Sequence, residues 1–539
     1  MRFWVWPCYS GGGWTMPDST ALLLLLLIPC VGVLLVGLQP GKSSCMPRIL
    51  TMMIMLVQLA MSGVIFLKYD AAAEAGRMDY NLSWIPSLGV NLHLAPDGLN
   101  IYLLLLSCLL FPVVLGCAWN TEQARSRLFL VLLMLMEVCL LGTFLSQNLM
   151  LFFVFWEAVL LPMFILILVF GGEKRRLAAR AFFLYTLAGS VLLLAAVILL
   201  GVESLQQTGN WSFEFDTLYR LHLDWNTQLF VFLAVVLACA IKCPLFPFHS
   251  WLPLTYCEAP ASGTALMAGV LSKMGAFGLL KLALPLCPLV ATVMAPYLSM
   301  LAVVSILYGA VLALRQENFK RLVAYSSLSH MGYIVLGIFS FQQTSVHGAL
   351  FQMLSHGAAV AGLFLLLGLL EQRLGTDYLS LNALSSRAPR LAILMMLMVL
   401  TTLALPLTSG FTSEFLILFG AFQQGMAAWG SDSGTIQLAA VLLATTGMVL
   451  GAAYMLRFAR AILYGSVHDS LQCPDLNVHE MLAFAPLLML IILIGVWPFS
   501  LMNKTQPAVA WLSERAVAHS ALPGAVAYST TRNGDTNGH

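Results

Sequence analysis

The chain has 539 residues, of which 60% are hydrophobic and only 9% are charged, and its formal net charge is +2. A soluble globular chain carries about 25% charged residues, and a long soluble chain divides into domains that each need a polar surface. The composition therefore excludes a soluble enzyme, a nucleic-acid-binding protein and a disordered scaffold. The main solvent of this protein is predicted to be the lipid bilayer.

Apolar stretches that are long enough to cross a bilayer as a helix, about 20 residues, follow one another along the chain. Proline or glycine interrupts two of them, at Pro244 and Pro247 and again at Pro406 and Gly410. The pattern predicts an all-α polytopic membrane protein with about fourteen transmembrane helices. The windows are 19–39, 48–68, 98–118, 127–146, 148–170, 178–201, 227–247, 262–284, 287–313, 321–340, 344–371, 390–425, 436–463 and 481–502.

The two interrupted windows are the seventh and the twelfth, and an odd spacing of five reverses the orientation in the membrane. Two inverted five-helix repeats, each with one broken helix, produce this pattern. The predicted units are an N-terminal extension 1–18 with a possible start at Met16, helices 1–3 in 19–126, the first repeat in 127–286, the second repeat in 287–464, a loop and helix 14 in 465–503, and a disordered tail in 504–539.

Lysine and arginine are distributed unevenly between the two predicted sides. Connections after odd-numbered helices hold sixteen of these residues, whereas the opposite side, with both termini, holds seven. By the positive-inside rule the odd connections are cytoplasmic. We therefore expect a protein of the bacterial inner membrane with both termini on the outer side.

A few charged residues remain inside the apolar windows. A charge in the middle of a membrane costs at least ~2.5–3.5 kcal/mol on insertion scales, so each is a functional candidate. Lys281 lies near the end of a window, where a lysine is expected to snorkel towards the interface. The six residues are Glu137, Glu157, Lys242, Lys273, Lys281 and Glu414.

Two histidines lie in adjacent windows, His330 in AYSSLSHMGY and His356 in QMLSHGAAVAG. A membrane histidine is commonly a packed, hydrogen-bonded residue, but histidine titrates near neutral pH and two between charged sites favour a proton relay. No acid or thiol accompanies them at a ligand spacing, which argues against a metal site. His249 follows the break of the seventh helix and is expected near the surface.

A glutamate and a lysine inside the membrane supply a mechanism for ion transport. Opposite charges 4 Å apart attract by about 4 kcal/mol at an effective dielectric constant of 20. A movement of Glu157 towards or away from Lys242 would therefore load or discharge the lysine, and the proton would continue through Lys273 and His330 to Glu414. No nucleophile with a base, phosphate loop, flavin site or iron–sulfur framework is evident, so this chain is expected to hold no cofactor.

Several segments together resemble a known family. FFVFWEAVLLPMF, AIKCPLFPFHSWLP, EAPASGTALMAGVLSKMGAFGLLK, KRLVAYSSLSHMGY and SGFTSEF are similar to the antiporter-like subunits of respiratory complex I, and within them to the chain M (chain 4) type. The similarity covers roughly residues 95–465. It implies fourteen helices with two inverted repeats, and a proton-translocating membrane subunit of an NADH:quinone oxidoreductase.

The resemblance also implies roles for individual residues and for partners. Chains L and N and the Mrp-type antiporter subunits usually have lysine at the position of Glu414. NAD, FMN, iron–sulfur clusters and quinone would belong to other subunits, and the sister chains L and N and the small chain K would be partners. The matched residues are Glu157 of helix five, Lys242 of helix seven, Lys273 of helix eight, the polar-axis histidines His330 and His356, and Glu414 of helix twelve.

Departures from the family pattern lie on the predicted cytoplasmic face, at Leu254, Tyr256, Asn318 and His479. They put the path of proton uptake and the usual partner complex in question. A subunit of an Mrp-type Na⁺/H⁺ antiporter, of a hydrogenase-linked complex or of a carbon-concentrating complex remains an alternative. A structural scaffold without transport fits less well, because a scaffold has no use for costly intramembrane charges.

Overall fold

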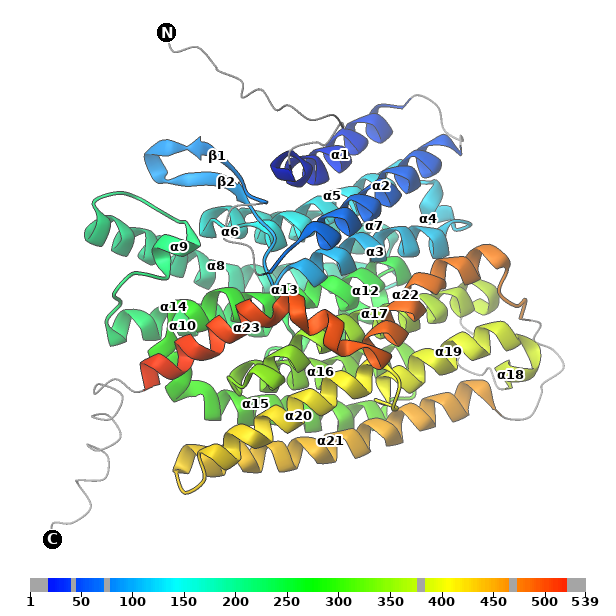
Figure 1. Ribbon diagram of the computed structural model, residues 1–539. Coiled ribbons are helices and arrows are strands. Elements are labelled where there is room, and N and C mark those ends of the chain that lie inside the picture. The colour runs from blue at the N-terminus through cyan, green and yellow to red at the C-terminus, as the bar shows by residue number, and fades with distance from the viewer. Residues whose placement is uncertain (1–17, 40–44, 72–77, 376–382, 465–472, 521–539) are drawn as a thin grey trace.

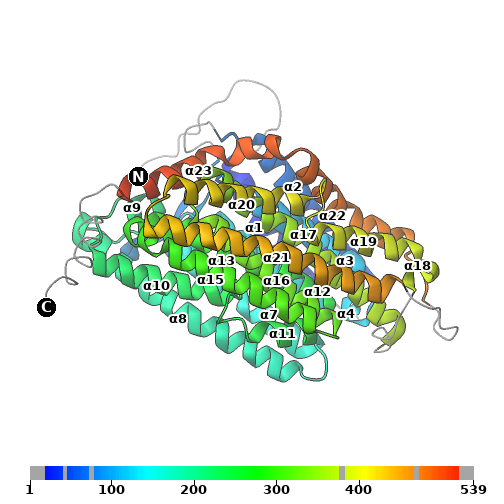
Figure 2. The same cartoon turned by 90° about the horizontal axis from the view of Figure 1, so that it is seen from below.

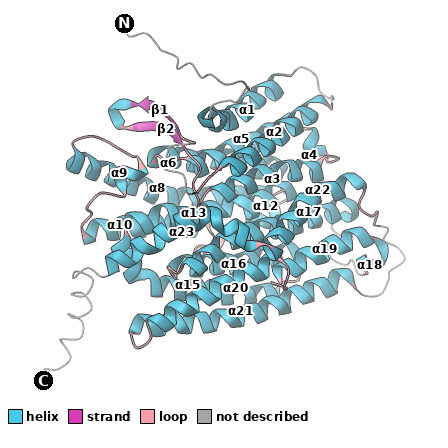
Figure 3. Ribbon diagram, in the orientation of Figure 1, coloured by secondary structure: helices cyan, strands magenta, loops and turns pink. Residues whose placement is uncertain are grey.

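The computed structural model describes residues 18–39, 45–71, 78–375, 383–464 and 473–520. They form a bundle of long helices that lie side by side, with one small β-hairpin at its edge (Figure 1, Figure 3). Except for Asp18, the expected N-terminal extension lies outside the described residues, and Met16 with it.

The N-terminal part contains three long helices, α1 (Asp18–Leu38), α2 (Met46–Lys68) and α3 (Ile101–Ala118). Between the last two, strands β1 (Tyr80–Ile85) and β2 (Val90–Leu94) pair antiparallel. The predicted all-α class is confirmed, and this hairpin is a small addition to it that the apolar windows did not indicate. Its strands are short and mix polar with apolar residues, and they lie between two apolar windows, where a search for membrane helices does not look.

The first predicted repeat contains the following elements: α5 (Arg127–Leu145), α6 (Leu149–Ala158), α7 (Leu160–Phe170), α8 (Arg175–Thr208), α10 (Trp225–Lys242), α11 (Trp251–Glu258), α12 (Ala261–Leu266), α13 (Ser272–Gly278) and α14 (Leu284–Leu286). The short helix α9 (Phe215–Leu218) lies in one of its connections, and the short helix α4 (Glu122–Arg125) precedes the repeat. The span that contains α12, α13 and α14 has two π-helical segments, Met267–Leu271 and Leu279–Ala283.

The second predicted repeat contains α15 (Pro288–Arg315), α16 (Phe319–Phe339), α17 (Gln343–Leu374), α18 (Leu384–Arg387), α19 (Pro389–Thr402), α20 (Ser409–Ala427) and α21 (Asp432–Leu463). Asn318, one of the departures from the family pattern, caps α16 by accepting a hydrogen bond from the amide of Arg321 at 3.1 Å. A side-chain oxygen at this position satisfies an amide that the first turn leaves free.

Both predicted helix interruptions are present. α10 ends at Lys242 and α11 begins at Trp251, while α19 ends at Thr402 and α20 begins at Ser409. Proline lacks an amide hydrogen and clashes with the preceding turn, so the prolines in these segments end the helices. A charged residue ends α10, and another, Glu414, lies early in α20.

The C-terminal part corrects the expected disordered tail. α22 (Val478–Val496) is followed by α23 (Pro498–Ser520), so residues 504–520 are helical; residues 521–539 lie outside the described part. Helix α23 crosses the front of the bundle in Figure 1 and packs on α14, α15 and α17. Its polar residues hide the helix from a search for apolar windows, although tertiary contacts hold it.

Thirteen helices of the described residues are long and apolar enough to cross a membrane, and α19 is a shorter apolar helix. The count of fourteen and the two repeats remain predictions. The span 261–286 and helix α17 are the most enclosed of the spans, with every residue of their apolar windows buried. Figure 2 shows α13, α16 and α17 between α8 and α10 on one side and α20 and α23 on the other.

Candidate functional site: a buried line of proton-binding groups

Lys242 lies at the broken end of α10 and contacts Trp156 rather than an acid. Its Nζ donates to the main-chain carbonyl of Trp156 at 2.8 Å and lies 4.1 Å from the centre of the indole ring. The indole Nε1 in turn donates to Ser190 Oγ at 3.2 Å. A carbonyl oxygen and an aromatic face both stabilise a buried ammonium. Together they stabilise it less than a carboxylate in direct contact would.

Glu157 is the next residue on α6 after Trp156, whose carbonyl and ring contact Lys242. The described residues contain no ion pair between the two side chains, and Glu157 Oε1 is buried without a hydrogen-bond partner. The expected neighbourhood of these residues is therefore present, while a direct pair is absent. This arrangement suits a carboxylate that changes its distance from the lysine.

Lys273 lies on α13 between the two π-helical segments, and it is fully buried. Its Nζ is 2.7 Å from His356 Nδ1 and also donates to the carbonyl of Ala268 at 2.5 Å. π-Helical turns are rare and often mark functional sites. A backbone of this kind holds the lysine against α17, where the histidine lies.

The line continues across α16 and α20. The rings of His356 and His330 have their centres 5.4 Å apart, and His330 Nδ1 lies 2.9 Å from Glu414 Oε1. The Nε2 atoms of both histidines are buried and have no hydrogen-bond partner. Four proton-binding side chains from four helices, α13, α17, α16 and α20, thus form one line through the buried centre.

Two close helix contacts join Lys242 to this line. Gly275, on the helix of Lys273, packs so tightly on the end of α10 that an added Cβ would lie 2.8 Å from the carbonyl oxygen of Cys239. Cys243 Sγ also contacts the carbonyl of Ser272 at 3.4 Å. No side-chain contact bridges the two lysines within the described residues, so a proton would need a mobile group or water between them.

Two sequence candidates lie outside the line. Glu137 on α5 is fully buried, and neither of its carboxylate oxygens has a hydrogen-bond partner. His249 is also buried: its ring stacks on that of Phe246 and meets that of Tyr308 edge-on, and its Nδ1 is unpartnered. The expectation that His249 lies near the surface is therefore wrong, because the segment after the break folds back against α15.

Lys281 does not need to snorkel, because it has an acidic partner. Its Nζ lies 2.6 Å from Asp97 Oδ2 and 2.9 Å from Gln147 Oε1. Sequence reasoning missed this pair, since Asp97 precedes α3 and is separated from the lysine by 184 positions. A second missed residue, Gln352, contacts both His330 and Glu414. The sequence could have indicated Gln352, because it is a polar residue in an apolar window and lies one helical turn before His356.

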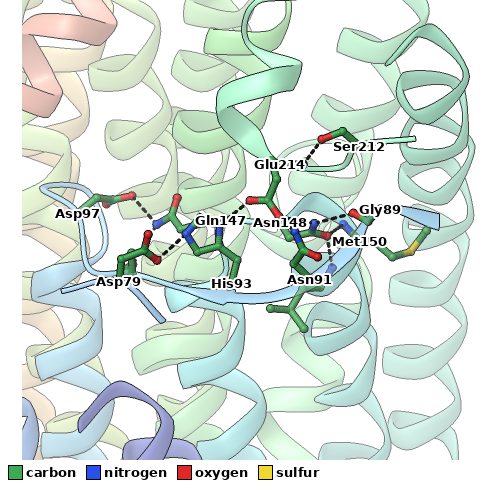
Figure 4. A network of polar contacts seen from close by, with 12 residues as sticks. Asp79, Gly89, Asn91, His93, Asp97, Gln147, Asn148, Met150, Ser212 and Glu214 are labelled. Atoms are coloured by element: carbon green, nitrogen blue, oxygen red, sulfur yellow. Dashed lines mark hydrogen bonds and ion pairs between the residues drawn. The ribbon is translucent and has the colours of Figure 1, made fainter. Parts of the chain in front are cut away.

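A polar network at one end of the bundle surrounds Glu214, as Figure 4 shows. Glu214 accepts hydrogen bonds at 2.9 Å from Asn91 and from Asn148, and its other oxygen lies 2.5 Å from His93. Asn148 also caps α6, the helix that carries Glu157. The network thus joins the β-hairpin, the loop before α9 and the start of α6.

Charge and burial act in opposite directions on this network. Burial by itself lowers the pKa of His93, but the hydrogen bond and charge of Glu214 outweigh it and raise that pKa above the ordinary 6.5. Burial would raise the pKa of Glu214, whereas hydrogen bonds from His93 and Asn148 hold it below the ordinary 4.5. The network borders a cavity of about 800 Å³ that is also lined by Asp97 and Lys281.

Comparison with known proteins gives a consistent result. Residues 146–431 match the family model described as NADH:quinone oxidoreductase/Mrp antiporter, TM. NADH-quinone oxidoreductase subunit M of Rickettsia typhi is 35% identical over 90% of this chain and 97% of its own length. The subunit M of Escherichia coli is 32% identical over 90% of this chain and 96% of its own length.

Solved structures share the fold. A chain of respiratory complex I from Thermus thermophilus is 30% identical and superposes with a TM-score of 0.81, covering 92% of this chain and 99% of that one. A chain of the Mrp complex from a Dietzia species has a TM-score of 0.76 at 24% identity, covering 93% of this chain and 52% of that one. The second likeness concerns the fold alone.

Proposed function

Because the chain belongs to the family of NADH:quinone oxidoreductase and Mrp antiporter transmembrane subunits, we propose that it carries protons across the membrane along the buried line from Lys242 to Glu414. The observation that carries this proposal is the set of contacts Lys273–His356 and His330–Glu414 between helices at the buried centre. The complex to which such a subunit M belongs is a bacterial respiratory NADH:quinone oxidoreductase, and this chain contributes a membrane-embedded part.

The chemistry of each step follows from the contacts. Lys242 receives a proton while Glu157 is close, and it loses the proton when that carboxylate moves away, because the remaining carbonyl and ring stabilise the ammonium less. Lys273 then passes a proton to His356 Nδ1, and His330 passes one to Glu414. The unpartnered Nε2 atoms of the two histidines are the positions where a water molecule can bridge the rings.

The redox chemistry lies outside this chain in the proposal. NAD, FMN, iron–sulfur clusters and quinone are assigned to other subunits, with sister chains L and N and the small chain K as membrane partners. Both termini and the β-hairpin are assigned to the outer side of the membrane, because the connections on the opposite side contain the excess of basic residues. Glu414 supports the M type over an Mrp-type antiporter, in which the resemblance leads us to expect lysine at that position.

The test is proton pumping by the purified complex in proteoliposomes, driven by NADH and quinone. We expect Glu414→Gln to reduce pumping strongly while the amount of assembled complex stays unchanged. Asp432→Asn is the control, because Asp432 is an exposed acid at the start of α21. Normal pumping by an assembled Glu414→Gln complex would refute the proposal, and Na⁺-dependent exchange without NADH-oxidising partners would replace it with antiport.

A further inference from the structure

A glutamine side chain lies against both atoms of the last proton-transfer step. Gln352 is on α17, is only 2% exposed, and lies one turn before His356. Its Nε2 is 3.1 Å from Glu414 Oε1 and 3.2 Å from His330 Nδ1. The amide therefore contacts the two atoms between which a proton would move.

The other end of the amide contacts a hydroxyl group that has a choice of partners. Gln352 Oε1 accepts a hydrogen bond from Ser413 Oγ, next to Glu414 on α20. The same Oγ lies 2.8 Å from the carbonyl of Ser409 and 3.0 Å from that of Gly410. A hydroxyl has one hydrogen, so it can donate to only one of these three oxygens at a time.

The observed orientation of the amide suits a charged Glu414. A glutamine amide has two donors at one end and an acceptor at the other. With its NH₂ group towards Glu414, it stabilises the carboxylate, and Ser413 satisfies the carbonyl end. Directly after the transfer, the O–H group of Glu414 can donate to His330 Nδ1, 2.9 Å away. Once His330 carries a proton on Nδ1 again, that atom is no longer an acceptor, and protonated Glu414 needs another one.

Turning the amide by 180° meets that requirement without any other movement of the chain. The carbonyl end of Gln352 would then accept from protonated Glu414 and from the reprotonated Nδ1 of His330, because a carbonyl oxygen has two lone pairs. Its NH₂ group would donate to Ser413 Oγ, whose hydrogen would turn to the carbonyl of Ser409. Every polar group keeps a partner in both states, and an unpaired buried polar group would otherwise cost about 1–3 kcal/mol.

We propose that Gln352 is an amide switch, which turns when His330 Nδ1 is reprotonated beside a protonated Glu414 and turns back when Glu414 loses its proton. This proposal rests on the proposed function of Glu414 in proton transport. Glu414 and His330 are 3% and 5% exposed, so bulk water cannot reorient around them as their charges change. The turning amide takes the place of water that would otherwise reorient around these groups. A glutamine that only held the helices together would keep one orientation throughout.

The experiment uses the purified complex and the variant Gln352→Met, which keeps the length and most of the volume of the side chain but removes both ends of the amide. We expect proton pumping to fall about tenfold or more at an unchanged amount of complex, because a hydrogen bond to a charged group is lost in the transfer step. The control is Gln228→Met. Gln228 is a buried glutamine on α10 that donates to the carbonyl of Leu223 and touches no group of the line.

A second measurement follows the amide directly and does not depend on the activity of a variant. In infrared difference spectra of the wild-type complex with ¹³C-labelled glutamine, we expect one side-chain amide band to change together with the carboxyl band of Glu414. The two bands are assigned by their loss in Gln352→Met and in Glu414→Gln. Gln352→Glu serves for the assignment if the Met variant does not assemble.

Two results would overturn the switch: an amide band that stays constant while the Glu414 band changes, or wild-type pumping by assembled Gln352→Met. If Glu414→Gln pumps normally, the proposed function itself is wrong, and the switch with it. If Glu414→Gln is inactive while Gln352→Met pumps normally, only the switch is wrong. The two failures are therefore distinguishable.

Discussion

Nζ of Lys273 and Nδ1 of His356 lie 2.7 Å apart, and no acid is bonded to either atom in the described residues. Two positive charges at this distance would repel each other by about 6 kcal/mol at an effective dielectric constant of 20. The repulsion therefore disfavours a charged lysine and a charged histidine at the same time. In the proposed relay, a second proton arrives from Lys242 only after the first has left towards His330.

This relationship predicts that charge alone is not enough at position 273. Arginine keeps a positive charge but does not release its proton in proteins. We expect Lys273→Arg to lose proton pumping as completely as Lys273→Met, in proteoliposomes with matched amounts of complex. Lys504→Arg is the control, because Lys504 donates to the carbonyl of Tyr69 outside the line. Restoration of pumping by Lys273→Arg would show that the site needs only a charge.

The close contact between the two lysine-bearing helices predicts a steric effect. An alanine at position 275 would place its Cβ 2.6 Å from Cys243 Sγ and 2.8 Å from the carbonyl of Cys239. We expect Gly275→Ala to lower the free energy of unfolding by about 1–3 kcal/mol, the usual cost of overpacking. The thermal midpoint of the purified complex reports this change. Gly63→Ala on α2 is the control, since no atom lies within 4 Å of its added Cβ, and equal midpoints for both variants would contradict the prediction.

The ion pair of Lys281 and Asp97 predicts that replacing one partner destabilises the protein more than replacing both. The side chains are 9% and 25% exposed, so a single removal leaves a poorly solvated charge. We expect Lys281→Met to destabilise the complex by about 3 kcal/mol, at the low end for a buried pair because Asp97 retains some contact with solvent. Adding Asp97→Asn should recover part of the loss, since asparagine keeps an acceptor for the amides of Leu99 and Asn100. Additive losses in thermal midpoint would argue against the pair.

The attachment of the β-hairpin is predicted to depend on pH. His93 stabilises the attachment of the hairpin fully below its ordinary pKa of 6.5, and this stabilisation is lost as pH rises through its raised pKa. Glu214 stabilises the attachment fully above its ordinary pKa of 4.5, and this stabilisation is lost as pH falls through its lowered pKa. Protection of residues 80–94 from hydrogen exchange, corrected for the intrinsic rate, should therefore be greatest between these two pH values.

The variant His93→Gln provides the comparison for that measurement. It keeps a donor for Glu214 but does not titrate. Its hairpin should lose protection only on the acidic side. If wild type and His93→Gln show the same alkaline profile, the histidine does not control the attachment.

The interrupted helices show which features of the fold can be predicted from the local sequence. Pro244 and Pro247 end α10 wherever the helix lies, because the missing amide and the ring clash are properties of the residue. The intramembrane charges were equally visible, since a charge in an apolar window is costly in any fold. The β-hairpin and α23 escaped prediction because neither is a long, uniformly apolar stretch and both depend on contacts with distant segments.

The amino-acid sequence alone was sufficient to place this chain in lipid, to mark its breaks and to single out Lys242, Lys273 and Glu414. Only the folded chain decided which groups meet: His330 with Glu414 across 84 positions and Lys273 with His356 across 83. Helical periodicity orients a side chain on its own helix, but it carries no information about which face of another helix packs there. Packing of α13, α16, α17 and α20 supplies that information, and it also places Gln352 against His330 and Glu414.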